Sequence, residues 1–209
     1  MQPSPLAHHF ESLDKQAHAS RLAMWIFLAT EVLLFTALFA GYSVYRFLFY
    51  DGFSQCSRSI ETWIGFVNTL ILVTSSFTVA TGLNFAAKGQ GRKTGLFFGI
   101  SVLFALAFLG LKAVEYTHHF QEGQLPGPYY HFAAVKAAGG PLFFSLYFLI
   151  TGLHAFHVIV GMTVLIVIGV LAYRGRFSPA YHVPVENAAL YWHLVDLIWI
   201  FVFPLIYLI

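Results

Sequence analysis

The sequence predicts an all-α integral membrane bundle of five transmembrane helices, with the amino terminus inside and the carboxyl terminus outside the membrane. Of its 209 residues, 58% are hydrophobic and only 10% are charged, whereas a soluble domain carries about 25% charged residues. This composition excludes an ordinary soluble globular protein and a disordered chain. The net charge of +2 is too small for a nucleic-acid-binding surface.

Five continuous apolar segments are long enough to cross a bilayer core, which requires roughly 20 helical residues. None alternates every second residue, as strands in a membrane barrel would. The fourth is longer than a straight span and is expected to tilt or to protrude from the bilayer. A polar cytoplasmic tail (1–21) is therefore expected to precede a five-helix transmembrane domain (22–209). The predicted spans are 22–47, 63–86, 95–114, 142–173 and 188–209.

The positions of Lys and Arg set the predicted orientation, because cytoplasmic loops carry an excess of these residues. The side with more of them is assigned to the inside. Seven lie on that side: Lys15, Arg21, Lys88, Arg92, Lys93, Arg174 and Arg176. Four lie on the other: Arg46, Arg58, Lys112 and Lys136.

The loops are expected to be short except for one on the outer side, which is expected to be irregular. The outer segment 115–141 contains Pro126 and the pair Gly139-Gly140, which favour turns over helix. Cys56 is expected to be an ordinary loop residue, and as the single cysteine it can form neither an internal disulfide nor a zinc site.

Glu31 is the most unusual residue of the first span, because an ionised carboxylate inside a bilayer costs several kcal/mol unless it is paired or hydrated. One interpretation is a proton-exchanging or lipid-contacting carboxylate. The other is a structural glutamate that is hydrogen-bonded to a neighbouring helix. Composition alone does not separate the two.

The second span is rich in small polar side chains, which can bond to the helix backbone or to a neighbouring helix. We expect these groups to serve interhelical packing. They are Asn68, Thr69, Thr74, Ser75, Ser76, Thr78 and Thr81.

His154 and His157 lie three residues apart, on one face of the fourth span. These two histidines could contribute to a metal site, but no acidic residue or cysteine lies near them in the sequence. Alternatively, His154 and His193 could hold a haem between two helices. Packing or hydrogen bonding is the favoured interpretation. His193 and Asp196 can bond to each other along the fifth span, in a polar cluster expected near the headgroup boundary.

Four segments carry motifs whose order and spacing agree with one known family. They are WIFLATEVLLFTALFAG at 25–41, LKAVEY at 111–116, GLHAFHVIVG at 152–161 and ENAALYWHLVDLIWIF at 186–201. The first resembles the family's span with the intramembrane glutamate, and the third resembles its paired-histidine helix. Together they resemble subunit III of the haem-copper oxidases, and the five-span length resembles bacterial forms.

The resemblance implies a non-catalytic subunit of a proton-pumping terminal oxidase of aerobic respiration, in the bacterial plasma membrane. It implies that haems and copper belong to subunits I and II, whereas this chain binds no cofactor. It also implies packing on subunit I, bound phospholipid and support of proton uptake. By this resemblance Glu31 is the protonatable carboxylate. The candidate lipid or subunit contacts are Glu115, His154, His157, Glu186, Trp192, His193, Asp196 and Trp199.

Other functions stay open at this point. A haem-binding redox protein would use His154, His157 or His193 as axial ligands, and a proton channel or transporter would use Glu31 as its gate. Within the family, a quinol oxidase is the alternative to a cytochrome c oxidase. Glu31 favours the latter, because the quinol branch often has aspartate there.

Overall fold

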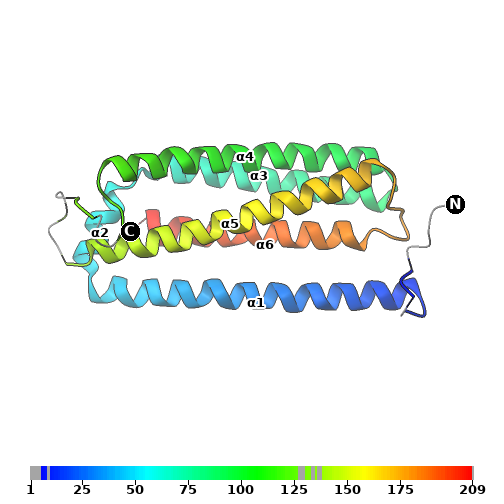
Figure 1. Cartoon of the computed structure of the whole chain (residues 1–209), viewed down its shortest axis with the longest axis horizontal. Coiled ribbons are helices and arrows are strands. Elements are labelled where there is room, and N and C mark those ends of the chain that lie inside the picture. Colours follow the sequence, from blue (N-terminus) through cyan, green and yellow to red (C-terminus); the bar gives the residue numbers. More distant parts are fainter. Residues whose placement is uncertain (1–5, 9, 127–129, 133–134, 136–137, 209) are drawn as a thin grey trace.

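The chain forms a bundle of long antiparallel helices (Figure 1). The computed structural model describes residues 6–8, 10–126, 130–132, 135 and 138–208. Over these residues five helices are long and apolar enough to cross a membrane, and no strand is formed beyond two isolated bridges. The predicted five-span all-α fold is therefore confirmed. The helices are α1 (Leu13–Leu48), α2 (Tyr50–Ser59), α3 (Thr62–Ala87), α4 (Gly91–Gln121), α5 (Gly140–Tyr173) and α6 (Val183–Tyr207).

Local sequence signals explain where several helices begin. The Ser12 side chain accepts the backbone N–H of Lys15 and caps α1, and Asp14 lies in the first turn, where the helix dipole favours a negative charge. Helix α1 therefore starts inside the predicted polar tail, at Leu13. Helices α5 and α6 each have a proline in the first turn, where its missing N–H costs nothing.

Helix α4 continues past the predicted end of its span, so the prediction of an irregular segment 115–141 is wrong as far as Gln121. Lys112, counted above with the cations of the outer side, lies in the last third of α4, but its side chain is inside the bundle and the residue is 3% exposed. In this last part of α4, Lys112, Glu115 and His119 are buried, and Lys112 is paired with Glu115. Lys136 and the last predicted span residue, Ile209, lie outside the described residues.

Helix α2 was not predicted, and the interpretation of Cys56 as a loop residue is wrong. Helix α2 buries Phe53, Cys56 and Ser57, and the Ser57 hydroxyl donates to the carbonyl oxygen of Ile206, 2.8 Å away. Ten residues with a polar composition are too few and too hydrophilic to register as a span. The helix instead closes the end of the bundle at which α1 ends and α3 begins (Figure 1).

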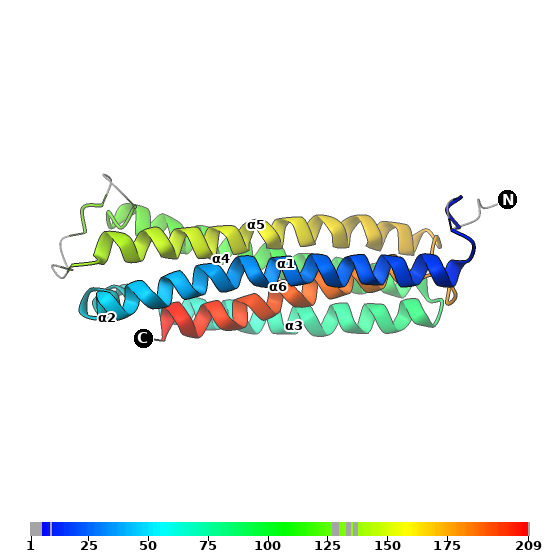
Figure 2. The same cartoon turned by 90° about the horizontal axis from the view of Figure 1, so that it is seen from below.

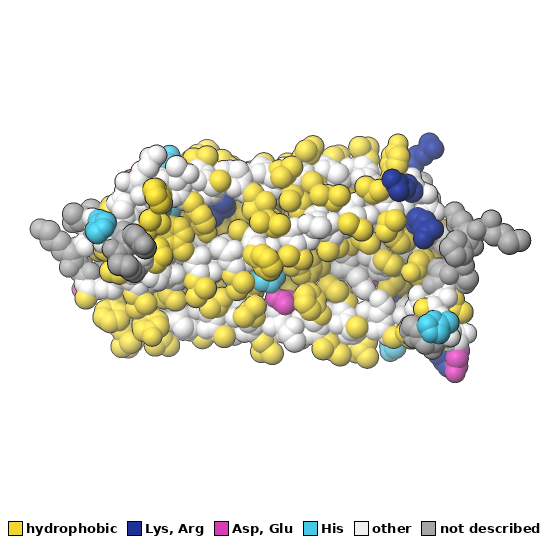
Figure 3. All heavy atoms as spheres, in the orientation of Figure 1, with side chains coloured by type: hydrophobic (Ala, Val, Ile, Leu, Met, Phe, Trp, Pro, Cys, Tyr) yellow, Lys and Arg dark blue, Asp and Glu magenta, His cyan; other side chains and the backbone are white. Residues whose placement is uncertain are grey.

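Helix α1 lies over the seam between α5 and α6, with α4 on the far side of the bundle (Figures 1 and 2). Most of its apolar side chains are exposed, as expected of a helix that faces lipid. Figure 3 shows that the length of one face is apolar and that Lys and Arg side chains gather at one end. We call this end, which holds the start of α1, the turn between α3 and α4 and the connection between α5 and α6, the basic end.

Candidate functional site

Glu31 of α1 contacts a histidine of α5. Its Oε2 lies 2.8 Å from Nε2 of His157, and the other ring nitrogen, Nδ1, lies 2.7 Å from the carbonyl oxygen of Leu153. Both side chains are mostly buried, with 15% and 10% exposed for Glu31 and His157. Phe35 packs edge-on against the imidazole ring, at 5.3 Å between centroids. A carboxylate in the middle of a predicted span is thus paired inside the protein.

The geometry constrains the protons of this pair. A carbonyl oxygen only accepts hydrogen bonds, so Nδ1 of His157 must carry a hydrogen. The contact between Nε2 and Glu31 then contains one proton, either on the imidazole or on the carboxyl group. In both arrangements the two side chains together carry no net charge, which suits a low-dielectric environment. The sequence could not reveal this pair, because its members are 126 positions apart.

Helix α1 is also attached at both of its ends. At the basic end, the Arg21 guanidinium donates twice to the Glu186 carboxylate, with distances of 2.7 and 3.1 Å. His182 also contacts that carboxylate, 3.0 Å away. At the other end, Tyr42 is fully buried against Phe53. Glu186, predicted to contact lipid or another subunit, thus has partners within its own chain.

Three polar side chains of α3, those of Thr69, Ser75 and Ser76, bind α6, as the predicted role in helix packing requires. Thr78 binds Ser101 of α4, whereas Thr74 and Thr81 donate to the backbone of their own helix. The indole N–H of Trp192 donates to Ser75 at 3.1 Å, and that of Trp199 donates to Thr69 at 3.0 Å. His193 shares a 2.7 Å hydrogen bond with Ser76. These bonds explain two of the candidate contacts, Trp192 and Trp199, as internal packing residues.

The predicted hydrogen bond between His193 and Asp196 is absent from the hydrogen bonds of the described residues, because Nδ1 of His193 is directed toward Ser76. The predicted location at the headgroup boundary is also wrong. Asp196 is 13 residues from the start of α6, about 20 Å along the helix, and is only 3% exposed. Helix α6 is polar in its buried middle because it faces the hydroxyl-rich α3.

The buried side chains of Asn68, His154 and Asp196 have no hydrogen-bond partner among the described residues, and neither does the Tyr42 hydroxyl. His154 packs edge-on against Phe108 and lies 5.1 Å from the ring of Trp199. His154, His157 and His193 therefore have three different sets of neighbours. The described part of the chain contains no group of three or more His, Cys, Asp or Glu residues arranged to hold a metal ion.

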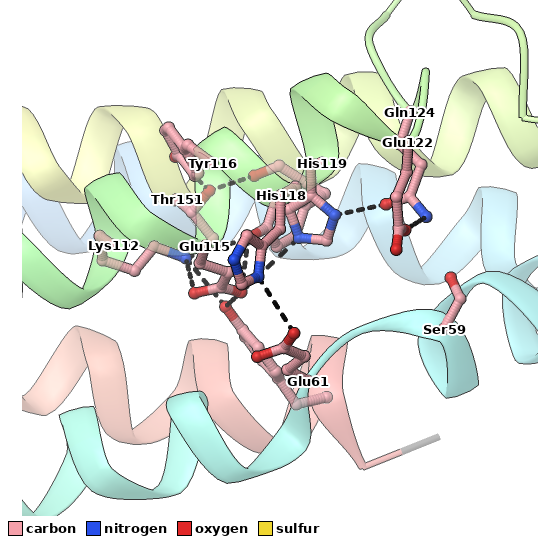
Figure 4. A network of polar contacts seen from close by, with 12 residues as sticks. Ser59, Glu61, Lys112, Glu115, Tyr116, His118, His119, Glu122, Gln124 and Thr151 are labelled. Atoms are coloured by element: carbon pink, nitrogen blue, oxygen red, sulfur yellow. Dashed lines mark hydrogen bonds and ion pairs between the residues drawn. The ribbon is translucent and has the colours of Figure 1, made fainter.

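A buried ion pair lies near the other end of the bundle from the basic end (Figure 4). Nζ of Lys112 lies 2.9 Å from Oε2 of Glu115 and also donates to the hydroxyls of Tyr147 and Tyr207, at 3.1 and 2.9 Å. The same hydroxyls donate to Oε1 of Glu115, at 2.7 and 2.6 Å. The rings of Tyr116 and Tyr147 lie 5.0 Å from Nζ. Helices α4, α5 and α6 therefore share one satisfied charge pair.

This network extends toward the surface. Nε2 of His119 lies 3.8 Å from Glu115, and Nδ1 bonds to Gln124, whose amide donates to Glu122 at 2.6 Å. On the neighbouring face, His118 contacts Glu61 (Figure 4). The sequence indicated Glu115 as a candidate contact, whereas Lys112 was counted only as a cation of the outer side. The spacing of three residues between them, which puts both on one helix face, was the available signal.

An apolar groove separates α1 from α6. It has a volume of about 640 Å³, and His193 is the polar residue among its lining side chains. A smaller groove of about 250 Å³ shares Val32, Leu194 and Leu197 and continues it past Phe35. His193 thus combines a bond to α3 with exposure to a lipid-sized groove.

Comparison with known proteins agrees with this architecture. A sequence profile of the family "Cytochrome c oxidase subunit III" matches residues 7–209. The chain is 31% identical over 191 residues to "Cytochrome c oxidase subunit 3" of Bacillus sp. (strain PS3), which covers 90% of this chain and 84% of that protein. It is 32% identical over 188 residues to the protein of the same name from Synechocystis sp., covering 88% and 72%.

A plant relative is longer. The chain is 34% identical over 149 residues to "Cytochrome c oxidase subunit 3" of Arabidopsis thaliana and covers 51% of its length, with 71% of this chain aligned. The chain therefore spans about half the length of that relative. The match to the family over nearly all residues, together with five membrane-spanning helices, places this chain in the cytochrome c oxidase subunit III family.

Proposed function

We propose that this chain is the non-catalytic subunit III of a proton-pumping haem-copper terminal oxidase. In that complex it packs on subunit I and is assembled together with subunit II. It holds phospholipid, and it supports proton uptake and the stability of the complex during turnover. The haems and copper of that complex belong to the partner subunits. The observation that carries the proposal is the Glu31–His157 pair, 2.8 Å apart in the middle of the apolar bundle. It gives a chain without a catalytic centre a group that can hold a proton.

The groove between α1 and α6 supports a lipid-binding role. The two grooves together extend from Trp25 to Phe39 along α1, about 21 Å of helix, which is more than half of a hydrocarbon core about 30 Å thick. Their lining is apolar except for His193 and Thr36. A lipid acyl chain would fill this groove and cover His193.

The distribution of exposed charges supports the proposed orientation, with the amino terminus in the cytoplasm of a bacterial cell and the chain in the plasma membrane. Lys112 belongs to the buried network, so two described cations, Arg46 and Arg58, remain at the end opposite the basic end. The excess of exposed Lys and Arg at the basic end over the opposite end is therefore larger than the count from the sequence, which included Lys112.

The electron donor proposed for the complex is cytochrome c, since the relatives named above carry cytochrome c oxidase in their names. A quinol donor remains the alternative. Purification of the tagged chain in mild detergent tests the proposal. The expected product contains subunits I and II in fixed stoichiometry and oxidises reduced cytochrome c. A preparation that oxidises only quinol would contradict the donor, and a chain that always purifies alone would contradict the subunit role.

A further inference from the structure

His119 lies in the last turn of α4, between the buried pair Lys112–Glu115 and the exposed Glu122 (Figure 4). The residue is 4% exposed. Three aromatic rings of α5 surround its imidazole at 5.0 to 6.1 Å between centroids, those of Phe144, Tyr147 and Phe148. A titratable ring is thus enclosed between a buried ion pair and a carboxylate at the surface.

The hydrogen bonds around His119 determine which ring nitrogen carries a hydrogen. The amide nitrogen of Gln124 donates to the Glu122 carboxylate at 2.6 Å, so the amide oxygen is the atom that contacts Nδ1 of His119. Because an amide oxygen only accepts hydrogen bonds, Nδ1 carries the hydrogen. In the neutral imidazole, Nε2 then has a free lone pair.

This lone pair is directed toward a carboxylate. Nε2 of His119 is buried and has no hydrogen-bond partner among the described residues, and Oε1 of Glu115 is 3.8 Å away. Two acceptors that face each other gain no hydrogen bond, whereas buried polar atoms are normally bonded. A proton on Nε2 would convert the contact into a hydrogen bond between two charged groups, which is stronger than a neutral one.

The charges around the ring favour such a proton. His119 lies in the last turn of α4, where the helix dipole favours a cation. Glu115 is in contact, and Glu122 is joined to the ring through Gln124. Lys112 opposes a second positive charge, but its Nζ is bonded to Oε2, the other oxygen of Glu115, at 2.9 Å. With the proton bound, two carboxylates balance the lysine and the histidine.

The other titratable groups near the ring leave Nε2 available. From α5 and α6, the hydroxyls of Tyr147 and Tyr207 already donate to Oε1 of Glu115, at 2.7 and 2.6 Å. Glu61, which precedes α3, contacts the neighbouring His118 at 3.1 Å. The imidazole nitrogen is therefore the acceptor to which a further proton goes.

We infer that Nε2 of His119 is a proton-binding site, which holds an exchangeable proton against Glu115 at the end of the bundle opposite the basic end. Uptake adds one proton from water and raises the charge of the network by one. Because aromatic rings enclose the imidazole, exchange passes the Gln124 amide, which lies between the ring and Glu122. The site is separate from the intramembrane pair of α1 and α5. Only its assignment to the outer side rests on the proposed orientation.

The test uses the purified complex with isotope-labelled histidine and solid-state NMR, which distinguishes a ring nitrogen with a hydrogen from one without. Above neutral pH, His119 is expected to carry its hydrogen on Nδ1 and none on Nε2. Acidification is expected to convert it to the imidazolium. Its signal is assigned by its loss in His119→Gln or, if that variant does not assemble, by contact with the Tyr147 ring, 5.0 Å away.

Glu122→Gln keeps a side chain that can accept from Gln124 but removes the charge. It is expected to weaken proton binding at His119 about threefold, because an exposed carboxylate contributes modestly. Glu61→Gln is the matched control, since this half-exposed glutamate contacts His118 instead, and it is expected to leave the titration of His119 unchanged.

A hydrogen on Nε2 of the neutral His119 ring would overturn the inference. A ring that stays neutral, or stays charged, over the whole pH range in which the complex is intact would also overturn it. Equal titrations in Glu122→Gln and Glu61→Gln would contradict the electrostatic basis of the site.

Discussion

Glu31 and His157 meet at 2.8 Å although they lie 126 positions apart in the chain, on α1 and α5. Because the backbone oxygen of Leu153 accepts from the other imidazole nitrogen, the pair holds one proton between two acceptors and stays neutral overall. This contact explains how a carboxylate is accommodated in the middle of a membrane helix. It also gives the chain a group whose proton can change position without a change in net charge.

Replacement of the Glu31 carboxylate distinguishes a role in holding a proton from a role in helix packing. Glu31→Gln can keep a hydrogen bond to His157 but cannot release a proton. The variant complex is expected to retain its haem content and its subunit stoichiometry while its activity declines faster during continuous turnover. Glu61→Gln, at a half-exposed glutamate outside the spans, is the control. An unchanged time course would contradict proton support by Glu31, and release of the chain would point to packing instead.

The buried pair Lys112–Glu115 is expected to be sensitive to removal of one partner. Lys112→Met leaves the Glu115 charge uncompensated and should destabilise the chain by about 3–5 kcal/mol. The double variant Lys112→Met/Glu115→Leu should lose less stability than the single Lys112→Met change, because no unpaired charge remains. Thermal unfolding of the purified complex measures both.

The control for this pair is Lys88→Met at an exposed lysine, where a change within about 0.5 kcal/mol is expected. A double variant that is less stable than Lys112→Met would mean that the pair itself stabilises the bundle.

The hydrogen bond between Trp199 and Thr69 should contribute modestly to the packing of α3 on α6. A double-mutant cycle with Trp199→Phe and Thr69→Val is expected to give a coupling energy of about 0.6 kcal/mol, and at most about 1.7 kcal/mol. Trp199→Phe alone should cost more, since it also removes contacts with Phe108 and His154. A coupling energy of zero would contradict the bond.

The Cys56 thiol gives a pH-dependent prediction. Burial raises its pKa from 9.0 to about 12. Between these values the unfolded chain loses the thiol proton and the folded chain keeps it, so stability should fall as the pH rises, by up to about 1.4 kcal/mol per pH unit. Thermal unfolding from pH 8 to 11, compared with Cys56→Ala, isolates this contribution.

The thiol should also resist alkylation by iodoacetamide at pH 8 while the chain is folded and react after unfolding, because the thiolate is the nucleophile. Rapid alkylation of the folded chain would show that the thiol is accessible, contrary to its full burial in α2.

Hydropathy predicted the five spans because a membrane helix must be apolar over a fixed length, and this requirement is local. It missed α2, which is short and polar, and the last turns of α4, which contain Glu115, His118 and His119. The polar residues at the end of α4 are buried through contacts with Tyr147 and Tyr207, on other helices. Hydropathy averaged over neighbouring residues does not detect that a charge is neutralised by residues distant in the sequence.

For the candidate site residues too, the sequence identified the residue but not its partner. The motif at 186–201 identified Trp192 and Trp199, but their partners on α3 depend on the register between two helices. Glu31 was identified by its cost in a bilayer, whereas the acceptor and donor around it come from α5. The sequence therefore indicates which residues are unusual in a membrane helix, and the tertiary structure determines what each of them contacts.

The most direct test of whether this chain is a cofactor-free subunit III is a reduced-minus-oxidised optical spectrum of the tagged chain, recorded after purification in mild detergent and again after a harsh detergent wash. If the chain is a cofactor-free subunit III, haem bands are present in the first sample, from the partner subunits, and absent from the second. Haem bands that remain with the isolated chain after the harsh wash would contradict this claim and make the chain itself the haem carrier.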